Sequence, residues 1–340
     1  MCIRDSRTEQ QEGTTLVTRV GSPVDQDVRT PGWWSLPRIV DQRVVVLAWA
    51  SFVVEVVLIG TGGLVRLTAS GLGCPTWPKC TADSLVSTPE MGIHGIIEFG
   101  NRLLTFVLVI VAVAMFLAVV RMLRTRPELF WLAFAQGVAI PVQAVIGGMS
   151  VWTNLNPFVV GLHFVVSAAL TSVTAALVYR TTHGPRTAQR LVPRWYTGVV
   201  RGTVAAVVVT VLVGILTTGS GPHAGADAAV DGGRLHRTGF DPAVMEHVHA
   251  WPAYALFALT LVLVIGAVRL GRPSKWPLLL LVVEFLQIAV GLTQARTGLP
   301  VGLVGTHMVL AGLLVGAVTA VVLSTRASAG RDAVREPIDA

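Results

Sequence analysis

The sequence contains few charged residues. Asp, Glu, Lys and Arg make up 13% of the 340 residues, whereas hydrophobic residues make up 53% and the mean hydropathy is +0.67. A soluble protein typically carries about a quarter charged residues, so this scarcity of charge excludes an ordinary soluble fold. The apolar residues occur in blocks of roughly 20, the length that crosses a hydrocarbon core of about 30 Å. The sequence therefore predicts a protein that crosses a membrane several times.

Two further features are missing. Residues 1–30 are polar and contain no apolar run, so we expect no cleaved signal sequence there, because such a sequence needs its own hydrophobic core. The net charge is +7, but no soluble domain gathers the Lys and Arg residues, so we do not expect nucleic acid as a partner. The two ends of the chain, 1–39 and 326–340, are predicted to be disordered tails.

Eight apolar blocks are long enough to cross the membrane. Lys and Arg gather after the second, fourth and sixth blocks and in the C-terminal tail, and by the positive-inside rule these segments are cytoplasmic. Both termini are therefore predicted to lie in the cytoplasm. The predicted spans are 44–66, 92–120, 129–151, 157–179, 198–219, 246–268, 276–295 and 301–324.

Only three cysteines are present, and one of them, Cys2, lies in the N-terminal tail. Cys74 and Cys80 lie in GLGCPTWPKC, in the first non-cytoplasmic loop. An oxidising compartment favours a disulfide there, and two prolines between the cysteines favour the turn that would bring them together. The alternative is two free thiols. A metal site is less favoured, because that loop contains no histidine.

The sequence contains an internal repeat, in which residues 143–170 align without a gap with residues 287–314. Upstream, IIEFGNRLL aligns with VMEHVHAWP, and TASG aligns with TGSG. Chance similarity between apolar segments explains shared Val and Leu, but it does not explain aligned polar residues. The aligned pairs are Gln143 with Gln287, Gly147 with Gly291, His163 with His307, Glu98 with Glu246, and Asn101 with His249.

The repeat predicts an all-α membrane protein built from two tandem four-helix bundles. The N-terminal half spans 40–190 and the C-terminal half spans 191–325. Because each half contains an even number of spans, both halves enter the membrane in the same direction, which makes this a parallel repeat.

The C-terminal half contains two histidines at similar depth. Glu246 and His249 are three residues apart and share a helix face. His307 lies about six residues into its helix, or roughly 9 Å below the surface. Facing histidines in a bundle commonly hold a metal or haem, and imidazole is a good ligand for haem iron. A hydrogen-bonded pair, a proton relay, and a zinc site with Glu246 as a further ligand are the alternatives.

The N-terminal half differs at one position. His163 has Asn101 opposite it instead of a second histidine, and Glu98 lies one turn away. Asn is a poor ligand for haem iron, so this half is predicted to leave one side of its pocket open for chemistry. His94 shares the face of Glu98 and Asn101, and it is a candidate ligand, a proton carrier or a plain interfacial residue.

Two arginines accompany these residues. Arg102 lies four residues after Glu98 and is the nearest candidate partner for its carboxylate. Arg66, near the outer end of the first span, is a candidate for binding a carboxylate such as a haem propionate. Both arginines are alternatively snorkelling side chains at the membrane interface.

Together these motifs resemble those of the haem A synthase family. The resemblance covers about 40–325, and the variants EFGNR and TGSGPHAG are similar to the form found in high-GC Gram-positive bacteria. It is carried by VRLTASG, GLGCPTWPKC, IIEFGNRLL, LHFVVSAAL, EHVHAW and GTHMVLAGLL.

The resemblance implies an eight-helix protein that holds haem b between His249 and His307. Its N-terminal half would receive haem O, with His163 as an iron ligand and Glu98 either moving protons or stabilising positive charge at the oxidised methyl. The implied reaction converts the C8 methyl of haem O to a formyl group by successive hydroxylations, giving haem A for terminal oxidases. The cysteine pair of the family matches Cys74 and Cys80.

The resemblance also implies a multi-pass protein of the bacterial plasma membrane, with its haem sites towards the outer side. The expected partners are the lipid bilayer, a haem O synthase and an electron donor that the sequence does not identify, and we allow for a homo-oligomer. Many family members have a histidine where this chain has Asn101, and some have a second cysteine pair that this chain lacks. A di-haem b electron carrier without catalysis and a transporter built on parallel repeats are the rival hypotheses.

Overall fold

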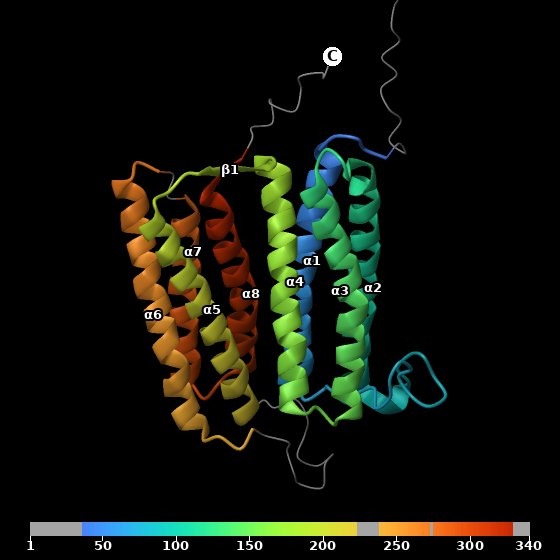
Figure 1. Cartoon of the computed structure of the whole chain (residues 1–340). Coiled ribbons are helices and arrows are strands. Elements are labelled where there is room, and N and C mark those ends of the chain that lie inside the picture. Colours follow the sequence, from blue (N-terminus) through green and yellow to red (C-terminus); the bar gives the residue numbers. More distant parts are fainter. Residues whose placement is uncertain (1–35, 223–237, 273–274, 329–340) are drawn as a thin grey trace, which may run out of the picture. The chain divides into compact units, whose positions relative to one another are not determined.

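The computed structural model describes residues 36–222, 238–272 and 275–328, all within one compact unit that begins at Leu36. The described residues form eight long helices, each apolar enough to cross a membrane (Figure 1). Each begins and ends within four residues of a predicted span. They are α1 (Gln42–Leu67), α2 (Gly92–Val119), α3 (Pro127–Trp152), α4 (Pro157–His183), α5 (Arg194–Ser220), α6 (Pro242–Arg269), α7 (Lys275–Arg296) and α8 (Val301–Ser324), with short 3₁₀ turns at Pro89–Met91 and Val120–Met122.

Several helices begin at capping residues that the sequence supplies. The Asp41 carboxylate accepts a hydrogen bond from the Val44 amide at 3.2 Å, and the Asp241 carboxylate accepts from the amides of Ala243 and Val244. Such caps satisfy backbone amides that the helix itself leaves without partners. Proline occupies the first position of α3, α4 and α6, where its missing N–H costs nothing.

The helices pack in two closed sets. In the first set, α1 contacts α2 and α4, and α3 contacts α2 and α4; in the second, α5 contacts α6 and α8, and α7 contacts α6 and α8. Separate buried apolar clusters fill the two sets. The sets meet where α8 packs against α1 and α4, and where α4 packs against α5. These contacts agree with two four-helix halves. That both halves cross the membrane in the same direction stays a prediction.

A short two-stranded sheet has no counterpart in the sequence-based prediction. β1 (Arg186–Arg190), between α4 and α5, pairs antiparallel with β2 (Arg326–Ser328), which follows α8. Because the partners are about 140 residues apart, no local pattern reveals the pairing. The expectation of disorder from 326 onward is therefore wrong for 326–328, while 1–35 and 329–340 lie outside the described residues.

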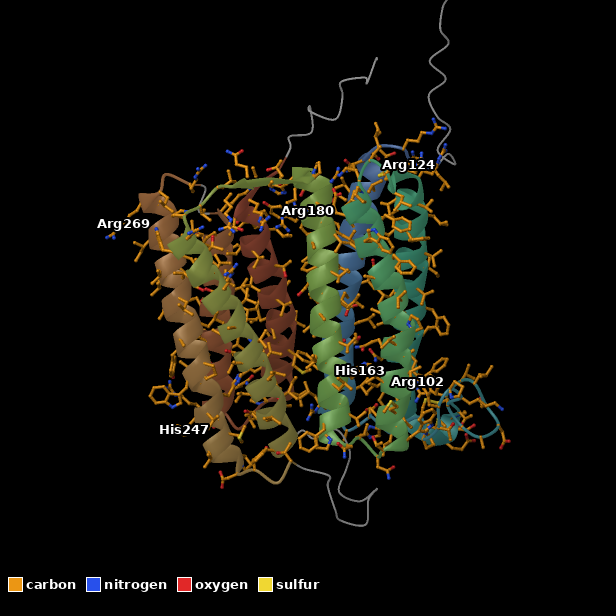
Figure 2. The ribbon with its side chains drawn as sticks, viewed as in Figure 1. Arg102, Arg124, His163, Arg180, His247 and Arg269 are labelled. Atoms are coloured by element: carbon orange, nitrogen blue, oxygen red, sulfur yellow. A yellow bond between two sulfur atoms is a disulfide. The ribbon has the colours of Figure 1, made fainter. Side chains whose placement is uncertain are left out.

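Charged residues separate between the two ends of the helices. Arg124, Arg180 and Arg269 lie at the end where β1 is found, and Arg102, His163 and His247 lie towards the opposite end (Figure 2). The basic end is the one that the positive-inside rule assigns to the cytoplasm. The assignment of each end to a side of the membrane stays a prediction.

Glycines bring α1 and α8 close together. A Cβ added at Gly312 would lie 3.1 Å from Cδ1 of Ile59, and one added at Gly316 would lie 2.8 Å from Cζ of Phe52. Small residues allow such close approach between membrane helices, where packing rather than the hydrophobic effect drives association. The contact between the two sets of helices therefore depends on the absence of side chains at these positions.

We expect Gly316→Val to lower the free energy of unfolding by about 1–3 kcal/mol, because the added methyl groups overlap the Phe52 ring. Thermal unfolding in detergent measures this as a lower Tm. Gly62→Ala on α1 is the control, since a Cβ there meets no atom within 4 Å. Equal Tm values for the two variants would contradict the importance of this contact.

Candidate functional site

The imidazole rings of His249 (α6) and His307 (α8) face each other. Their centroids are 6.3 Å apart and their planes are inclined by 70°. The Nδ1 atoms of both rings are buried, and the imidazoles of His249 and His307 interact with the backbones of Thr210 and Gln287, respectively. Since a metal ion lies about 2 Å from an imidazole nitrogen, two such bonds and two ring radii add up to about 6 Å. The separation therefore suits one metal ion, such as haem iron, bound by both rings.

Neighbouring residues hold each of these rings. Gln287 Nε2 donates a hydrogen bond to the backbone oxygen of His307 at 3.1 Å. A Cβ added at Gly291 would lie 3.2 Å from Cε1 of His307, and one added at Gly214 would lie 2.8 Å from Cε1 of His249. The two glycines thus provide flat helix surfaces on which the rings lie.

The first half repeats this arrangement around His163 of α4. Gln143 Nε2 donates to the backbone oxygen of His163 at 2.8 Å, and a Cβ added at Gly147 would again lie 3.2 Å from Cε1 of the histidine. The Nδ1 atom of His163 is also buried without a hydrogen bond to the described residues. The aligned Gln, Gly and His residues therefore play the same structural part in both halves.

Asn101 marks the difference between the two halves. It aligns with His249, but its amide oxygen accepts a hydrogen bond from the Thr61 hydroxyl of α1 at 2.7 Å. This bond ties the side chain to the neighbouring helix. The first half therefore presents one half-buried imidazole where the second half presents two.

Glu98 is buried, with 6% of its surface exposed, and it forms an ion pair with Arg102 at 2.5 Å. Its second carboxylate oxygen accepts a hydrogen bond from the backbone amide of Cys74 at 2.7 Å. The guanidinium of Arg102 also donates to the backbone oxygens of Cys74, Thr76 and Lys79. Arg102 is thus confirmed as the partner of Glu98. That this pair also anchors a loop could not be predicted from the sequence.

That loop, residues 74–80, contains the predicted disulfide. Cys74 and Cys80 are bonded and fully buried. Within the loop, Trp77 packs edge-on against Trp152 of α3, with ring centroids 5.3 Å apart, and it also covers Gly148. The disulfide, the tryptophan contact and the Glu98–Arg102 pair together fix this loop, which we call the disulfide loop, over the ends of α2 and α3.

The remaining predicted site residues lie nearer the surface. His94 is exposed, and its Nδ1 atom is 2.9 Å from the Ser70 hydroxyl. Arg66 is half-buried in the last turn of α1. Glu246 is exposed, in contrast to its aligned partner Glu98. Among the described residues, no three His, Cys, Asp or Glu side chains come together to hold a metal ion.

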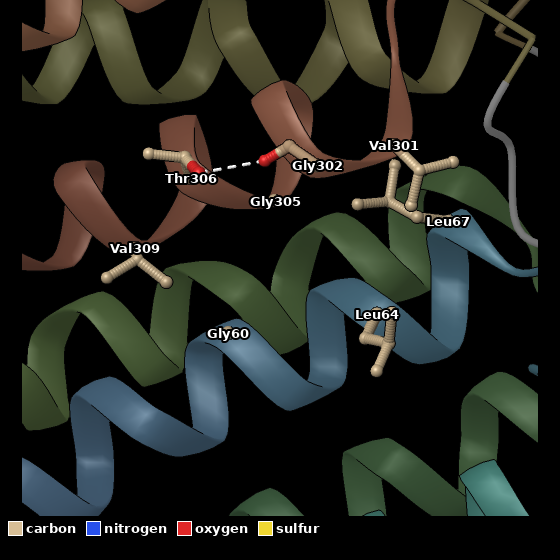
Figure 3. Close-up of a pocket in the computed structure, with 8 residues that line it drawn as sticks. All are labelled: Gly60, Leu64, Leu67, Val301, Gly302, Gly305, Thr306 and Val309. Carbon is tan, nitrogen blue, oxygen red and sulfur yellow. Dashed lines mark hydrogen bonds between the residues drawn. The ribbon is translucent and has the colours of Figure 1, made fainter.

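A groove lies between α1 and α8, with a volume of about 420 Å³ (Figure 3). Gly60 on its α1 side neighbours Thr61, which holds Asn101, and Thr306 on its α8 side neighbours His307. The groove is therefore bordered by helix segments from both candidate sites. Its lining is formed by Gly60, Leu64, Leu67, Val301, Gly302, Gly305, Thr306 and Val309.

Two buried carboxyl groups were missed in the sequence. Glu55 of α1 is 2% exposed and Glu284 of α7 is 3% exposed. Both lie inside apolar spans, where ionisable residues are expensive and commonly functional. An ionisable residue inside an apolar span is the feature that made Glu98 a candidate, and the sequence shows the same feature at Glu55 and Glu284.

The fold and the site define an α-helical, multi-pass membrane protein with matched sites of half-buried histidines. Residues 45–319 match the family described as COX15-CtaA, cytochrome oxidase assembly protein, and the chain belongs to this family.

Several relatives carry the name "Heme A synthase". The protein from Bacillus pumilus is 36% identical over 139 residues, which cover 39% of this chain and 43% of the relative. Those from Shouchella clausii and Exiguobacterium sibiricum are 28% and 26% identical over 247 and 252 residues. The latter two alignments cover 71% and 72% of this chain, and 80% and 82% of the relatives. The chain thus spans under half of the first relative and about four-fifths of the other two.

We expect Arg102→Ala to lower the free energy of unfolding by about 3 kcal/mol, because it leaves the buried Glu98 carboxylate without its ionic partner. Thermal unfolding in detergent measures the loss, and hydrogen exchange should show reduced protection in the disulfide loop. Arg43→Ala is the matched control, because the Arg43–Asp41 pair is more exposed to solvent and such pairs contribute about 0–1 kcal/mol. A loss for Arg102→Ala no larger than that of the control would contradict the anchoring role.

Proposed function

We propose that this protein is a haem A synthase, which oxidises the C8 methyl of haem O to a formyl group by successive hydroxylations and supplies haem A to terminal oxidases. Membership of the family and the names of its relatives support the reaction. The observation that carries the proposal is the pair of matched histidine sites that differ at Asn101. The second half has two histidines that would bind one iron, whereas the first half has one histidine and Asn101.

In the second half, His249 and His307 would hold haem b through its iron. The 6.3 Å between ring centroids and the buried Nδ1 atoms fit this assignment. Bound there, the haem would supply one-electron redox chemistry. Gly214 and Gly291 keep the rings in place, Gln287 fixes the backbone at His307, and the exposed Glu246 borders the site from one turn away.

In the first half, His163 would bind the iron of the substrate haem O. Asn101, held by Thr61, would leave the opposite face open. Arg102 orients the Glu98 carboxylate and holds the disulfide loop, which would shield the site from water. His94 and Arg66 lie nearer the surface, where Arg66 is suited to bind a haem propionate.

The proposal includes the arrangement of the whole chain. Residues 40–190 would form the substrate half and residues 191–325 the haem b half, in the bacterial plasma membrane, with both termini in the cytoplasm and the haem sites towards the outer side. The implied partners are a haem O synthase, which supplies the substrate, and an electron donor. A homo-oligomer is compatible with this arrangement.

We expect His249→Ala and His307→Ala to lose the retained haem b, because each removes an axial ligand. Glu98→Ala should keep haem b but abolish haem A formation, because its site lies in the other half. The visible spectrum of the purified protein measures haem b, and chromatography with mass analysis after co-expression with a haem O synthase measures the product. His247→Ala is the control, since His247 is exposed on the same helix as His249.

These measurements also separate the rival functions. A colourless preparation of the wild-type protein would exclude both haem-based hypotheses and leave the transporter. Haem b without haem A would leave the electron carrier. Haem A formation that persists in Glu98→Ala would show that the assigned role of Glu98 is wrong.

Two glycine variants should separate the two halves. Gly291→Leu is expected to displace the His307 ring and lower haem b content at least several-fold, whereas Gly147→Leu displaces His163 and should lower haem A formation while haem b remains. Gly198→Ala is the control, because a Cβ there meets no atom within 4 Å. Identical phenotypes for the two leucine variants would argue against separate sites.

A further inference from the structure

Glu284 is a carboxyl group buried in the middle of α7. Its neighbours Leu280 and Val283 belong to the apolar cluster of the second half. A buried carboxyl in such surroundings is costly unless it is protonated or paired. The Thr260 hydroxyl of α6 donates a hydrogen bond to its Oε1 atom at 2.7 Å, while Oε2 is buried and makes no hydrogen bond with the described residues.

No cation compensates this carboxyl in the part of the chain that the structure describes. The three ion pairs found there are Arg43–Asp41, Arg102–Glu98 and Arg126–Glu128. The helix α7 packs chiefly against α6 and α8. The other titratable or charged residues of these three helices lie towards the helix ends, except Tyr254, which lies near the middle of α6 with an exposed side chain. The others are Glu246, His247, His249 and Arg269 on α6, Lys275 and Arg296 on α7, and His307 on α8.

The first half has no such polar pair. In the internal repeat, the alignment of Glu246 with Glu98 also aligns Thr260 with Ala112. The alignment of Gln287 with Gln143 also aligns Glu284 with Ile140. Ala112 and Ile140 are buried together in an apolar cluster. The carboxyl and its hydroxyl partner are therefore features of the half that is proposed to hold haem b.

Glu284 lies one helix turn from Gln287 along α7, whereas its partner Thr260 lies eleven residues, or about 16 Å along the helix axis, from His249 on α6. Glu284 precedes Gln287 by three residues, which corresponds to about 4.5 Å along the helix axis. Gln287 is the residue that donates to the backbone oxygen of His307. Glu284 therefore lies about one helix turn from Gln287, which fixes the backbone of the proposed iron ligand His307.

We propose that Glu284 binds a proton when the haem held by His249 and His307 is reduced, and releases it when that haem is oxidised. This inference rests on the proposed function. One electron from a reduced one-electron carrier converts ferric to ferrous iron, and one proton from water converts the Glu284 carboxylate to the acid. The net charge of the buried region then stays constant, which is favoured where the dielectric constant is low.

The test is a redox titration of the haem b absorbance in purified full-length protein at several pH values, with dithionite as reductant and soluble mediators. In the wild type, the midpoint potential should fall as the pH rises, by up to about 59 mV for each tenfold change in proton concentration. Glu284→Gln retains the shape and the Thr260 contact but has no titrating group, so this dependence should be lost or strongly reduced.

Glu55→Gln is the matched control, because it removes the other buried carboxyl, which lies on α1 in the first half. Its potential should depend on pH as in the wild type. Redox-induced infrared difference spectra give an independent readout: the wild type should show the carbonyl band of a protonated carboxyl appearing on reduction, and Glu284→Gln should lack it.

A wild-type potential that does not change with pH would overturn the inference, whether or not Glu284→Gln folds. An unchanged dependence in Glu284→Gln, or its loss in Glu55→Gln alone, would do the same. These outcomes differ from a failure of the proposed function, which would appear as absence of haem b from the wild-type spectrum or of haem A from co-expressing cells.

Discussion

The cost of placing polar groups among apolar helices governs this structure. Inside a bilayer, backbone groups must be satisfied within helices, and polar side chains must find partners in the protein or bind a ligand. The Glu98–Arg102 pair, the bond from Thr61 to Asn101 and the bond from Thr260 to Glu284 obey this constraint. The Nδ1 atoms of His163, His249 and His307 are buried in the same apolar setting, and together with their matched positions in the two halves this makes the histidines the candidate sites.

The two halves share a scaffold and differ in their chemistry. In each half, a glutamine fixes the backbone of a histidine, and a glycine makes room for its ring. Two aligned positions differ between the halves. His249 of the second half corresponds to Asn101 of the first, and Glu284 corresponds to Ile140. Under the proposed function, few substitutions separate the half that would hold haem b from the half that would bind the substrate, because the helices that position these residues stay the same.

The structure gives Glu98 a structural role that the sequence did not predict. The sequence predicts that Glu98 carries protons or stabilises positive charge in an active site. In the structure, both carboxylate oxygens are engaged, one by Arg102 and one by the amide of Cys74. Its first task is therefore to hold the disulfide loop over the first half. If Glu98 also takes part in the chemistry, its carboxylate does so while it is held by Arg102 and the Cys74 amide.

The sequence by itself determined the eight helices, their ends to within four residues, the repeat, and the disulfide partners. These follow from span length, aligned polar residues and the presence of two cysteines in one loop, all of which are local or repeated along the chain. Only the tertiary structure decided the pairing of β1 with β2, the anchoring of the disulfide loop by Arg102, and the bond between Thr260 and Glu284. Each of these joins residues more than 20 positions apart, and such contacts depend on how helices pack, which no periodicity in the sequence encodes.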